Sequence, residues 1–151
     1  MSEEQIKKLT EDLLKNLLVK GTVEVTQDSK NQVFNVQLES EDSGILIGYH
    51  GETLEAIQLI LSLIVYRKVG SWLRLVVNVG NYREERYDQL KRLALNIAQK
   101  VKFSGESQIL TNLSPSERRI IHLELADHPD VITESEGEGE ERRLVVKPKN
   151  S

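Results

Sequence analysis

The stretch Ile45-Leu46-Ile47-Gly48-Tyr49-His50-Gly51-Glu52-Thr53-Leu54 places two glycines three residues apart, between a short apolar run and a long helical pattern. Glycine has no Cβ and adopts positive φ readily, so this spacing predicts a tight turn that another backbone can approach closely. The helix after Gly51 would present N–H groups and its positive dipole end at the same place. A phosphodiester backbone suits such a turn, whereas the alternative is an ordinary helix-to-helix turn that needs glycine only for its φ.

Apolar spacing on both sides of the turn predicts a first domain, residues 1–80. Apolar residues at helical spacing include Leu17 and Leu18 near the end of the first helix, and alternating apolar residues mark the strands. The expected elements are a helix over 4–19, strands over 22–27 and 34–38, a short helix over 45–47, a helix over 53–69 and a strand over 73–79. Helices stacked on one face of a hairpin plus one further strand form an α+β arrangement.

A second domain is expected over residues 81–151. Its predicted elements are a helix over 82–102, a strand over 108–111, a helix over 114–126, and strands over 131–134 and 144–147. Phe103-Ser104-Gly105-Glu106 is expected to break the first helix. Ser114-Pro115-Ser116-Glu117 has the N-cap serine, first-turn proline and following glutamate of a helix start. The acidic glycine-containing segment 134–141 is expected to be a solvated hairpin loop.

The helix after Pro115 carries the second motif, Arg118-Arg119-Ile120-Ile121-His122. Arg118 and His122 are four residues apart and share one helix face, while Ile121 and Leu125 share another and are expected to pack inward. An exposed Arg–His pair can hydrogen-bond a phosphate and stack on a base. A solvated helix face is the alternative, and it is the commoner case for an isolated Arg-x-x-x-His.

The overall charge restricts how nucleic acid could bind. The net charge is −4 and the pI is near 5.5, whereas phosphate binding normally needs clustered Lys and Arg. A nucleic-acid site must therefore be a local patch of modest affinity. Arg142 or Arg143 could extend a patch beside Arg118 if the last strand lies next to that helix.

Several classes of protein receive no support from the sequence. There is no cysteine, the three histidines lack metal-ligand spacing, and no phosphate-binding G-x-x-x-x-G-K-[ST] is present. No enzyme activity, metal or cofactor is therefore expected. The longest apolar stretch is too short to span a bilayer of about 30 Å, so no membrane insertion is expected. The acidic, polar start is unlike a secretory signal, and a cytoplasmic location is expected.

The two motifs together resemble a known family. Residues 47–54 look like the core of a K-homology (KH) domain, and residues 114–122 look like the R-three-H domain, named for its Arg-x-x-x-His. A KH module followed directly by an R-three-H module, over about residues 3–148, is similar to the arrangement in the bacterial Jag proteins, also called SpoIIIJ-associated or KhpB/EloR proteins. The resemblance implies a prokaryotic-type (type II) KH domain followed by a small α/β R-three-H domain.

The same resemblance implies which residues contact single-stranded RNA, or alternatively single-stranded DNA: Gly48, Tyr49, His50, Gly51, Arg118, Arg119 and His122. It also implies a small KH-domain partner or a homodimer, and a post-transcriptional role linked to cell elongation or division. Two departures stand out. Tyr49-His50 replaces the usual basic residue of the glycine turn, and the separate N-terminal domain of many Jag proteins has no counterpart in this chain.

Single-stranded RNA binding without catalysis is the leading hypothesis. The alternative is a protein-interaction adaptor that pairs with another KH subunit and has little intrinsic RNA affinity, which the acidic pI favours. A hydrolase is a distant third.

Overall fold

The computed structural model describes residues 1–149, in two compact units, Met1–Arg83 and Glu84–Ser151. Residues 150 and 151, the last two of the second predicted domain, lie outside the described residues. Helix α4 (Tyr82–Ser104) begins at the end of the first unit and continues into the second. Within residues 1–149, no helix is long and apolar enough to cross a membrane.

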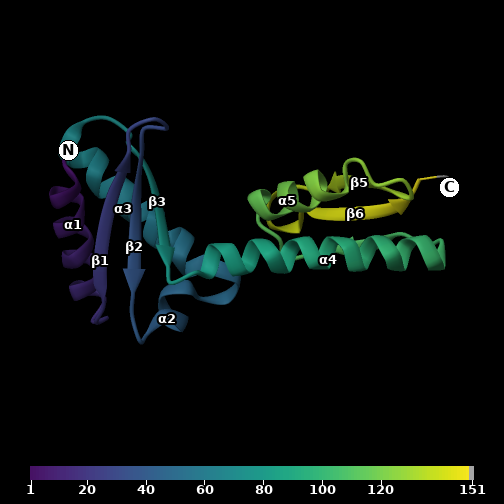
Figure 1. Ribbon diagram of the computed structural model, residues 1–151, viewed down its shortest axis with the longest axis horizontal. Helices are drawn as coiled ribbons and strands as arrows, with labels where there is room; N and C mark the ends of the chain where they lie inside the picture. The colour runs from purple at the N-terminus through teal and green to yellow at the C-terminus, as the bar shows by residue number, and fades with distance from the viewer. Residues whose placement is uncertain (150–151) are drawn as a thin grey trace. The chain divides into compact units, whose positions relative to one another are not determined.

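The first unit has the helix-first order expected from the sequence. Its elements are α1 (Glu3–Asn16), β1 (Thr22–Asp28), β2 (Val33–Glu39), α2 (Ser43–Ile47), a 3-10 turn (Tyr49–Gly51), α3 (Glu52–Val69) and β3 (Arg74–Val79). The sheet order is β1-β2-β3; β1 and β2 are antiparallel, and β2 and β3 are parallel. Helices α1 and α3 pack along this sheet (Figure 1). The predicted α+β class is confirmed.

Alternating and helical apolar spacing explain the core of this unit. Val23 and Val25 in β1 face the same side as Val36 and Leu38 in β2, and all four are buried. Helix α3 covers them with a buried stripe at intervals of three and four residues: Leu54, Ile57, Leu61 and Val65. Each such side chain contributes about 1.5–3 kcal/mol when it is removed from water, so the apolar stripe determines which face of α3 packs on the sheet.

Polar contacts at the open edge of β3 add a second restraint on α3. The Gln58 Oε1 atom accepts hydrogen bonds from the Val77 N–H (2.9 Å) and from Arg83 Nη2 (2.9 Å). Arg83 Nε donates to the Val77 carbonyl at 2.7 Å. Burial lowers the pKa of Arg83 below its ordinary value, and the nearby charge of Glu55 acts in the opposite direction. Together Gln58 and Arg83 satisfy the outward backbone groups of Val77 and tie α3 to the sheet.

The second unit is a three-stranded antiparallel sheet with helices against it. After α4 it contains β4 (Gln108–Leu110), α5 (Pro115–Leu125), β5 (Val131–Glu136), a 3-10 turn (Gly139–Glu141) and β6 (Arg143–Pro148). The strand order is β4-β6-β5. Helix α5 packs against β5 (Figure 1). The core joins both helices to β5 and β6: Leu90, Ala94, Ala98, Val101, Leu113, Ile121, Leu125, Val131, Leu144 and Val146.

Candidate functional site

The glycine turn has the backbone conformation that its sequence predicts. Gly48 has φ 70° and Gly51 has φ 82°, so both residues lie in the positive-φ region that favours glycine. His50, between them, is also left-handed at φ 51°. The turn connects α2 to α3, and Gly51 is the N-cap residue of α3, where no side chain caps the helix. The positive end of this helix therefore lies directly at the turn.

The space that the glycines leave open is filled by the first unit itself. A Cβ on Gly48 would lie 2.8 Å from the Thr53 Cβ atom, and a Cβ on Gly51 would lie 3.0 Å from Cε2 of Tyr82. The close backbone approach expected from the sequence is thus an approach to the chain's own side chains. The glycines permit the positive φ of the turn, and Thr53 and Tyr82 pack against it in the absence of any ligand.

Two aromatic rings project from the turn. Tyr49 is 61% exposed, and its ring stacks on that of His50 with centroids 4.0 Å apart and an interplanar angle of 19°. The neighbouring charges are acidic, because Glu52 and Glu55 lie in the first turn of α3. The turn therefore offers ring faces and a helix dipole, and no Lys or Arg side chain of its own.

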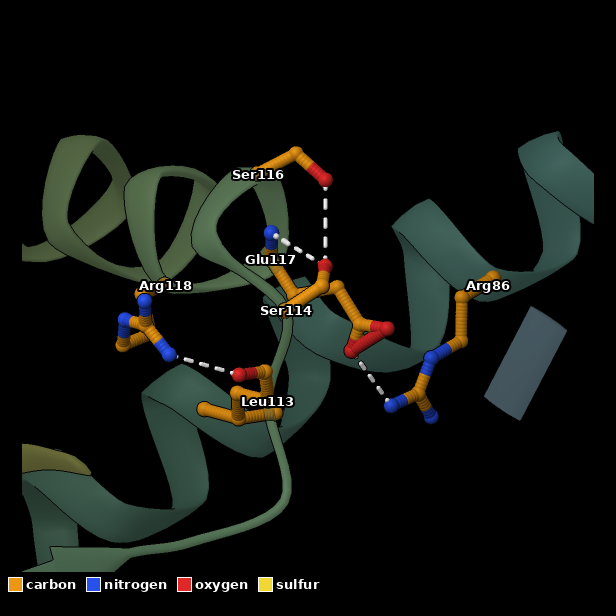
Figure 2. Close-up of polar contacts among 6 residues, drawn as sticks. All are labelled: Arg86, Leu113, Ser114, Ser116, Glu117 and Arg118. Carbon is orange, nitrogen blue, oxygen red and sulfur yellow. Dashed lines mark hydrogen bonds and ion pairs between the residues drawn. The ribbon is translucent and has the colours of Figure 1, made fainter. Parts of the chain in front are cut away.

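Arg118 is not exposed as the sequence predicts. It is 9% exposed, and Nη1 donates a hydrogen bond to the Leu113 carbonyl at 2.7 Å (Figure 2). Position 118 shares a face with position 122, but Arg118 is buried and bonds the Leu113 carbonyl of the loop that precedes α5. The prediction of an exposed Arg–His pair is wrong for this reason: helix periodicity cannot register a loop that packs against the helix.

A buried ion pair fixes the start of α5, and sequence reasoning missed it. Arg86 Nη2 lies 2.7 Å from the Glu117 Oε2 atom, with 17% and 10% of their side chains exposed (Figure 2). Ser114 caps the helix by accepting the Glu117 N–H, as predicted, and its hydroxyl lies 3.1 Å from that of Ser116. Arg86 and Glu117 belong to different elements, 31 residues apart, and no local pattern connects them.

His122 and Arg119 remain at the surface of α5. His122 Nδ1 lies 2.5 Å from the Thr133 hydroxyl in β5, and this hydrogen bond orients the exposed ring. Arg119 is exposed on the solvent side of the helix. It lies one turn before Leu123, which is also exposed. The structure thus brings His122 together with Thr133, a residue that the sequence does not single out.

Basic residues of β6, and Arg142 just before it, contact residues 134–137 of the β5–β6 hairpin. Arg142 Nη1 donates to the Gly137 carbonyl at 2.7 Å, and Arg143 Nη2 lies 3.9 Å from a Glu136 carboxylate oxygen. Lys147 Nζ contacts Glu134 at 2.6 Å, and this hydrogen bond raises the pKa of Lys147 above its ordinary value. Glu134 and Glu136 therefore pair with Arg143 and Lys147, whereas Arg142 contacts a backbone carbonyl. The loop expected over 134–141 is shorter than predicted, because residues 134–136 belong to β5 and pair with β6.

The described part of the chain contains no group of three or more His, Asp or Glu side chains placed to hold a metal ion.

Comparisons with known proteins agree with this architecture. Residues 7–79 match the family model described as KhpA/KhpB, KH domain, and residues 88–148 match that of the R-three-H domain. The chain is 40% identical over 131 residues to RNA-binding protein KhpB of Clostridium symbiosum, covering 87% of this chain and 58% of that protein. It is 32% identical over 133 residues to RNA-binding protein KhpB of Bacillus subtilis, covering 87% of this chain and 64% of that protein.

RNA-binding protein KhpB of Lactiplantibacillus plantarum is 34% identical over 125 residues, which are 83% of this chain and 39% of that protein. The chain thus spans between about two fifths and two thirds of the length of these relatives. Both predicted modules are present in the predicted order: the chain consists of a KH domain of the KhpA/KhpB family followed by an R-three-H domain.

Proposed function

We propose that this chain binds single-stranded RNA at the Gly48–Gly51 turn. The observation that carries the proposal is an exposed, stacked Tyr49–His50 pair at the uncapped N-terminus of an 18-residue helix. A phosphate is favoured at this end of a helix, and aromatic rings accept the faces of unstacked bases. The relatives named RNA-binding protein KhpB support the assignment of RNA as the ligand.

The Gly48–Gly51 turn would hold single-stranded RNA through the backbone and the aromatic rings of the turn rather than through ion pairs. Packing of Thr53 against Gly48 and of Tyr82 against Gly51 restrains the turn before RNA arrives, which reduces the conformational entropy lost on binding. Stacking on Tyr49 tolerates every base, because each base has a π face. Glu52 and Glu55 oppose the approach of phosphate, and the affinity should be modest.

The second unit would supply another contact through His122 and Arg119, which are exposed on α5. Arg118 would act from beneath as a positioning residue, because its guanidinium is engaged with the Leu113 carbonyl. Arg142 and Arg143 would contribute only where RNA phosphates displace their contacts with Gly137 and Glu136.

The test is RNA affinity in the double variant Tyr49→Asp/His50→Asp. Both residues are exposed, and aspartate tolerates the left-handed conformation at position 50. Loss of both rings and the added negative charge should weaken binding of a short single-stranded RNA at least about tenfold, since stacking alone is worth about 1–3 kcal/mol per base. Fluorescence anisotropy with RNA and DNA of the same sequence measures the effect and shows which of the two is preferred.

A matched control places the same two charges elsewhere on the first unit. Ser29→Asp/Gln32→Asp changes exposed residues in the β1–β2 turn, at the opposite end of the sheet from α2 (Figure 1). The control should bind RNA as the unaltered chain does. Equal losses in both variants would show a general charge effect, and no loss in Tyr49→Asp/His50→Asp would remove the turn from the site.

The proposal extends to post-transcriptional regulation linked to cell elongation or division, which the family resemblance implies. Crosslinking in cells and sequencing of the bound RNA would test it. The regulatory role is supported if the transcripts bound by the unaltered chain, and lost in Tyr49→Asp/His50→Asp, encode proteins of elongation or division. An unchanged set of transcripts in the variant would contradict it.

A protein-interaction adaptor is the second candidate, and one observation favours it. Helix α3 exposes Leu59, Ile60 and Leu63, which are large and apolar, on the side away from its buried stripe. Such a surface could pair with a second copy or another KH subunit. Size measurement with and without RNA distinguishes the candidates, because an adaptor would assemble whether or not RNA is present.

A further inference from the structure

The end of helix α4 exposes an aromatic ring that the core of the second unit does not use. Phe103 is 77% exposed, more than any other Phe, Tyr or Trp in the described part of the chain. The buried face of α4 consists of Leu90, Ala94, Ala98 and Val101. Leu95, Gln99 and Phe103 follow one another at intervals of four, so they form a separate stripe along the surface of the helix.

Two open hollows adjoin this ring. One, of about 300 Å³, is lined by Phe103 and Gln99 together with Leu95, Lys102, His128 and Asp130. The other, of about 540 Å³, is lined by Phe103 and Gln99 together with Asn96, Lys100 and Ser104. Because Phe103 lines both hollows, a flat ligand can reach it from either one. These volumes lie in or near the range of small-ligand sites.

The charges around the ring favour an anion despite the acidic chain. Lys100 is exposed and forms no ion pair within residues 1–149. Lys102 Nζ lies 3.4 Å from the Asp130 Oδ2 atom, and its side chain is 54% exposed, so this ion pair is weak and can be exchanged for a phosphate. The two lysines outweigh Asp130 and offset the negative dipole end of α4.

Polar groups beside the ring can hydrogen-bond the edge of a base. His128 Nδ1 accepts the Asp130 N–H at 3.1 Å, which leaves its Nε2 atom as the hydrogen-bond donor of the neutral ring. Gln99 and Asn96 line the hollows with side-chain amides, which both donate and accept. A protein interface would have a larger apolar centre, whereas a single ring among amines and amides is the composition of a single-strand contact.

We propose that this surface is a separate contact for single-stranded RNA, in which a base stacks on Phe103 and adjoining phosphates lie at Lys100 and Lys102. We call it the Phe103 platform; its residues are Leu95, Asn96, Gln99, Lys100, Lys102, Phe103 and His128. It lies wholly within the second unit, and it rests on the proposed binding of single-stranded RNA by the chain.

The test compares Phe103→Leu with Phe103→Tyr in the full chain. Leucine retains apolar surface and removes the ring, whereas tyrosine retains the ring. Binding of a single-stranded RNA of about 16 nucleotides, long enough to occupy more than one contact, is measured by fluorescence anisotropy. Phe103→Leu should weaken binding at least about fivefold, the lower limit for loss of one stacked base, and Phe103→Tyr should bind like the unaltered chain.

Two further variants make the result specific. Tyr87→Leu removes another exposed ring of α4, whose face is occupied by Lys91 Nζ at 5.3 Å from the centroid, and it should leave the affinity unchanged. Crosslinking of RNA that contains 4-thiouridine should label the peptide that carries Phe103, and Lys100→Ala/Lys102→Ala should weaken that labelling. Because Phe103 is exposed, circular dichroism should show the same fold in Phe103→Leu.

The outcomes separate this proposal from the proposed function. If Tyr49→Asp/His50→Asp loses affinity while Phe103→Leu binds normally and no crosslink forms at Phe103, the platform is wrong and RNA binding at the turn stands. If the unaltered chain binds no single-stranded RNA, both are wrong. If Phe103→Leu changes the mass of the assembly that the protein forms in solution and leaves RNA affinity unchanged, the platform binds a protein partner and the proposal is overturned.

Discussion

At the scale of single residues, the arginine and the histidine of the Arg-x-x-x-His motif have different surroundings, because Arg118 is buried and His122 is exposed. The Arg118 Nη1–H satisfies the Leu113 carbonyl of the loop that precedes α5, at a buried position. Arg118→Ala would leave that carbonyl without its donor, which should lower the free energy of unfolding by about 1–3 kcal/mol. Urea denaturation followed by circular dichroism measures the change, and RNA affinity should fall only as far as α5 is displaced.

Arg119→Ala is the matched variant, since it removes the same functional group from the solvent side of the same helix. It should change the free energy of unfolding by no more than about 0.5 kcal/mol, as surface substitutions usually do, and it should weaken RNA binding directly. The opposite pattern, with Arg118→Ala fully stable and unable to bind RNA, would show that Arg118 contacts the ligand.

At the scale of elements, the N-terminus of α3 combines two electrostatic effects of opposite sign. Glu52 is exposed in the first turn, where its negative charge interacts favourably with the helix dipole and stabilises the helix by about 0.3–1 kcal/mol. The same charge repels a phosphate at the adjacent glycine turn. Glu52→Gln should therefore lower the stability of the first unit slightly and raise RNA affinity on the order of twofold to fivefold, since exposed charges at contact interact by about 1 kcal/mol in water.

The measurement is anisotropy at low and high salt, because screening should remove most of the gain at about 1 M salt, where the Debye length is about 3 Å. Glu11→Gln is the control: Glu11 is exposed on α1, and its replacement changes the net charge equally. A gain of the same size in the control would attribute the effect to net charge and not to the turn.

The elements also show what the sequence could predict. Every α-helix and strand of both units has a counterpart among the predicted elements, and the long helices were predictable because each buries one apolar face. Periodicity failed at helix ends: Leu17 and Leu18 fit the pattern of α1, but the helix stops at Asn16 and Leu18 is left-handed and exposed. Phe103, expected in a helix-breaking segment, lies in the last turn of α4, so its platform could not be anticipated from local pattern.

Contacts between distant elements were beyond the sequence for a different reason. Arg83 reaches Gln58 across 25 residues, and Arg86 reaches Glu117 across 31. Arg118 is buried at a position that spacing alone assigns to the surface. Each depends on tertiary packing, which local propensity does not encode. The glycine turn was predictable because positive φ is a local property of the residues that adopt it.

At the scale of the whole molecule, the apolar surface of α3 bears on the oligomeric state. Leu59 and Leu63 are 59% and 43% exposed and lie one helical turn apart, beside Ile60. Burying one leucine is worth about 1.5–3 kcal/mol, so pairing through this surface should give a concentration-dependent dimer. Leu59→Gln/Leu63→Gln should raise the dimer dissociation constant at least about tenfold, with no change in net charge.

Sedimentation velocity over a range of concentrations, with and without RNA, measures this dissociation. Leu18→Asn is the control, because Leu18 is an exposed leucine outside α3 and asparagine tolerates its left-handed backbone; it should dimerise normally. A dimer that forms equally without RNA and is lost in Leu59→Gln/Leu63→Gln would favour the adaptor, and normal RNA affinity in that variant would show that the two activities use separate surfaces. If the unaltered chain is monomeric at every concentration, α3 is not a surface for self-association, and an adaptor would then require a different KH subunit.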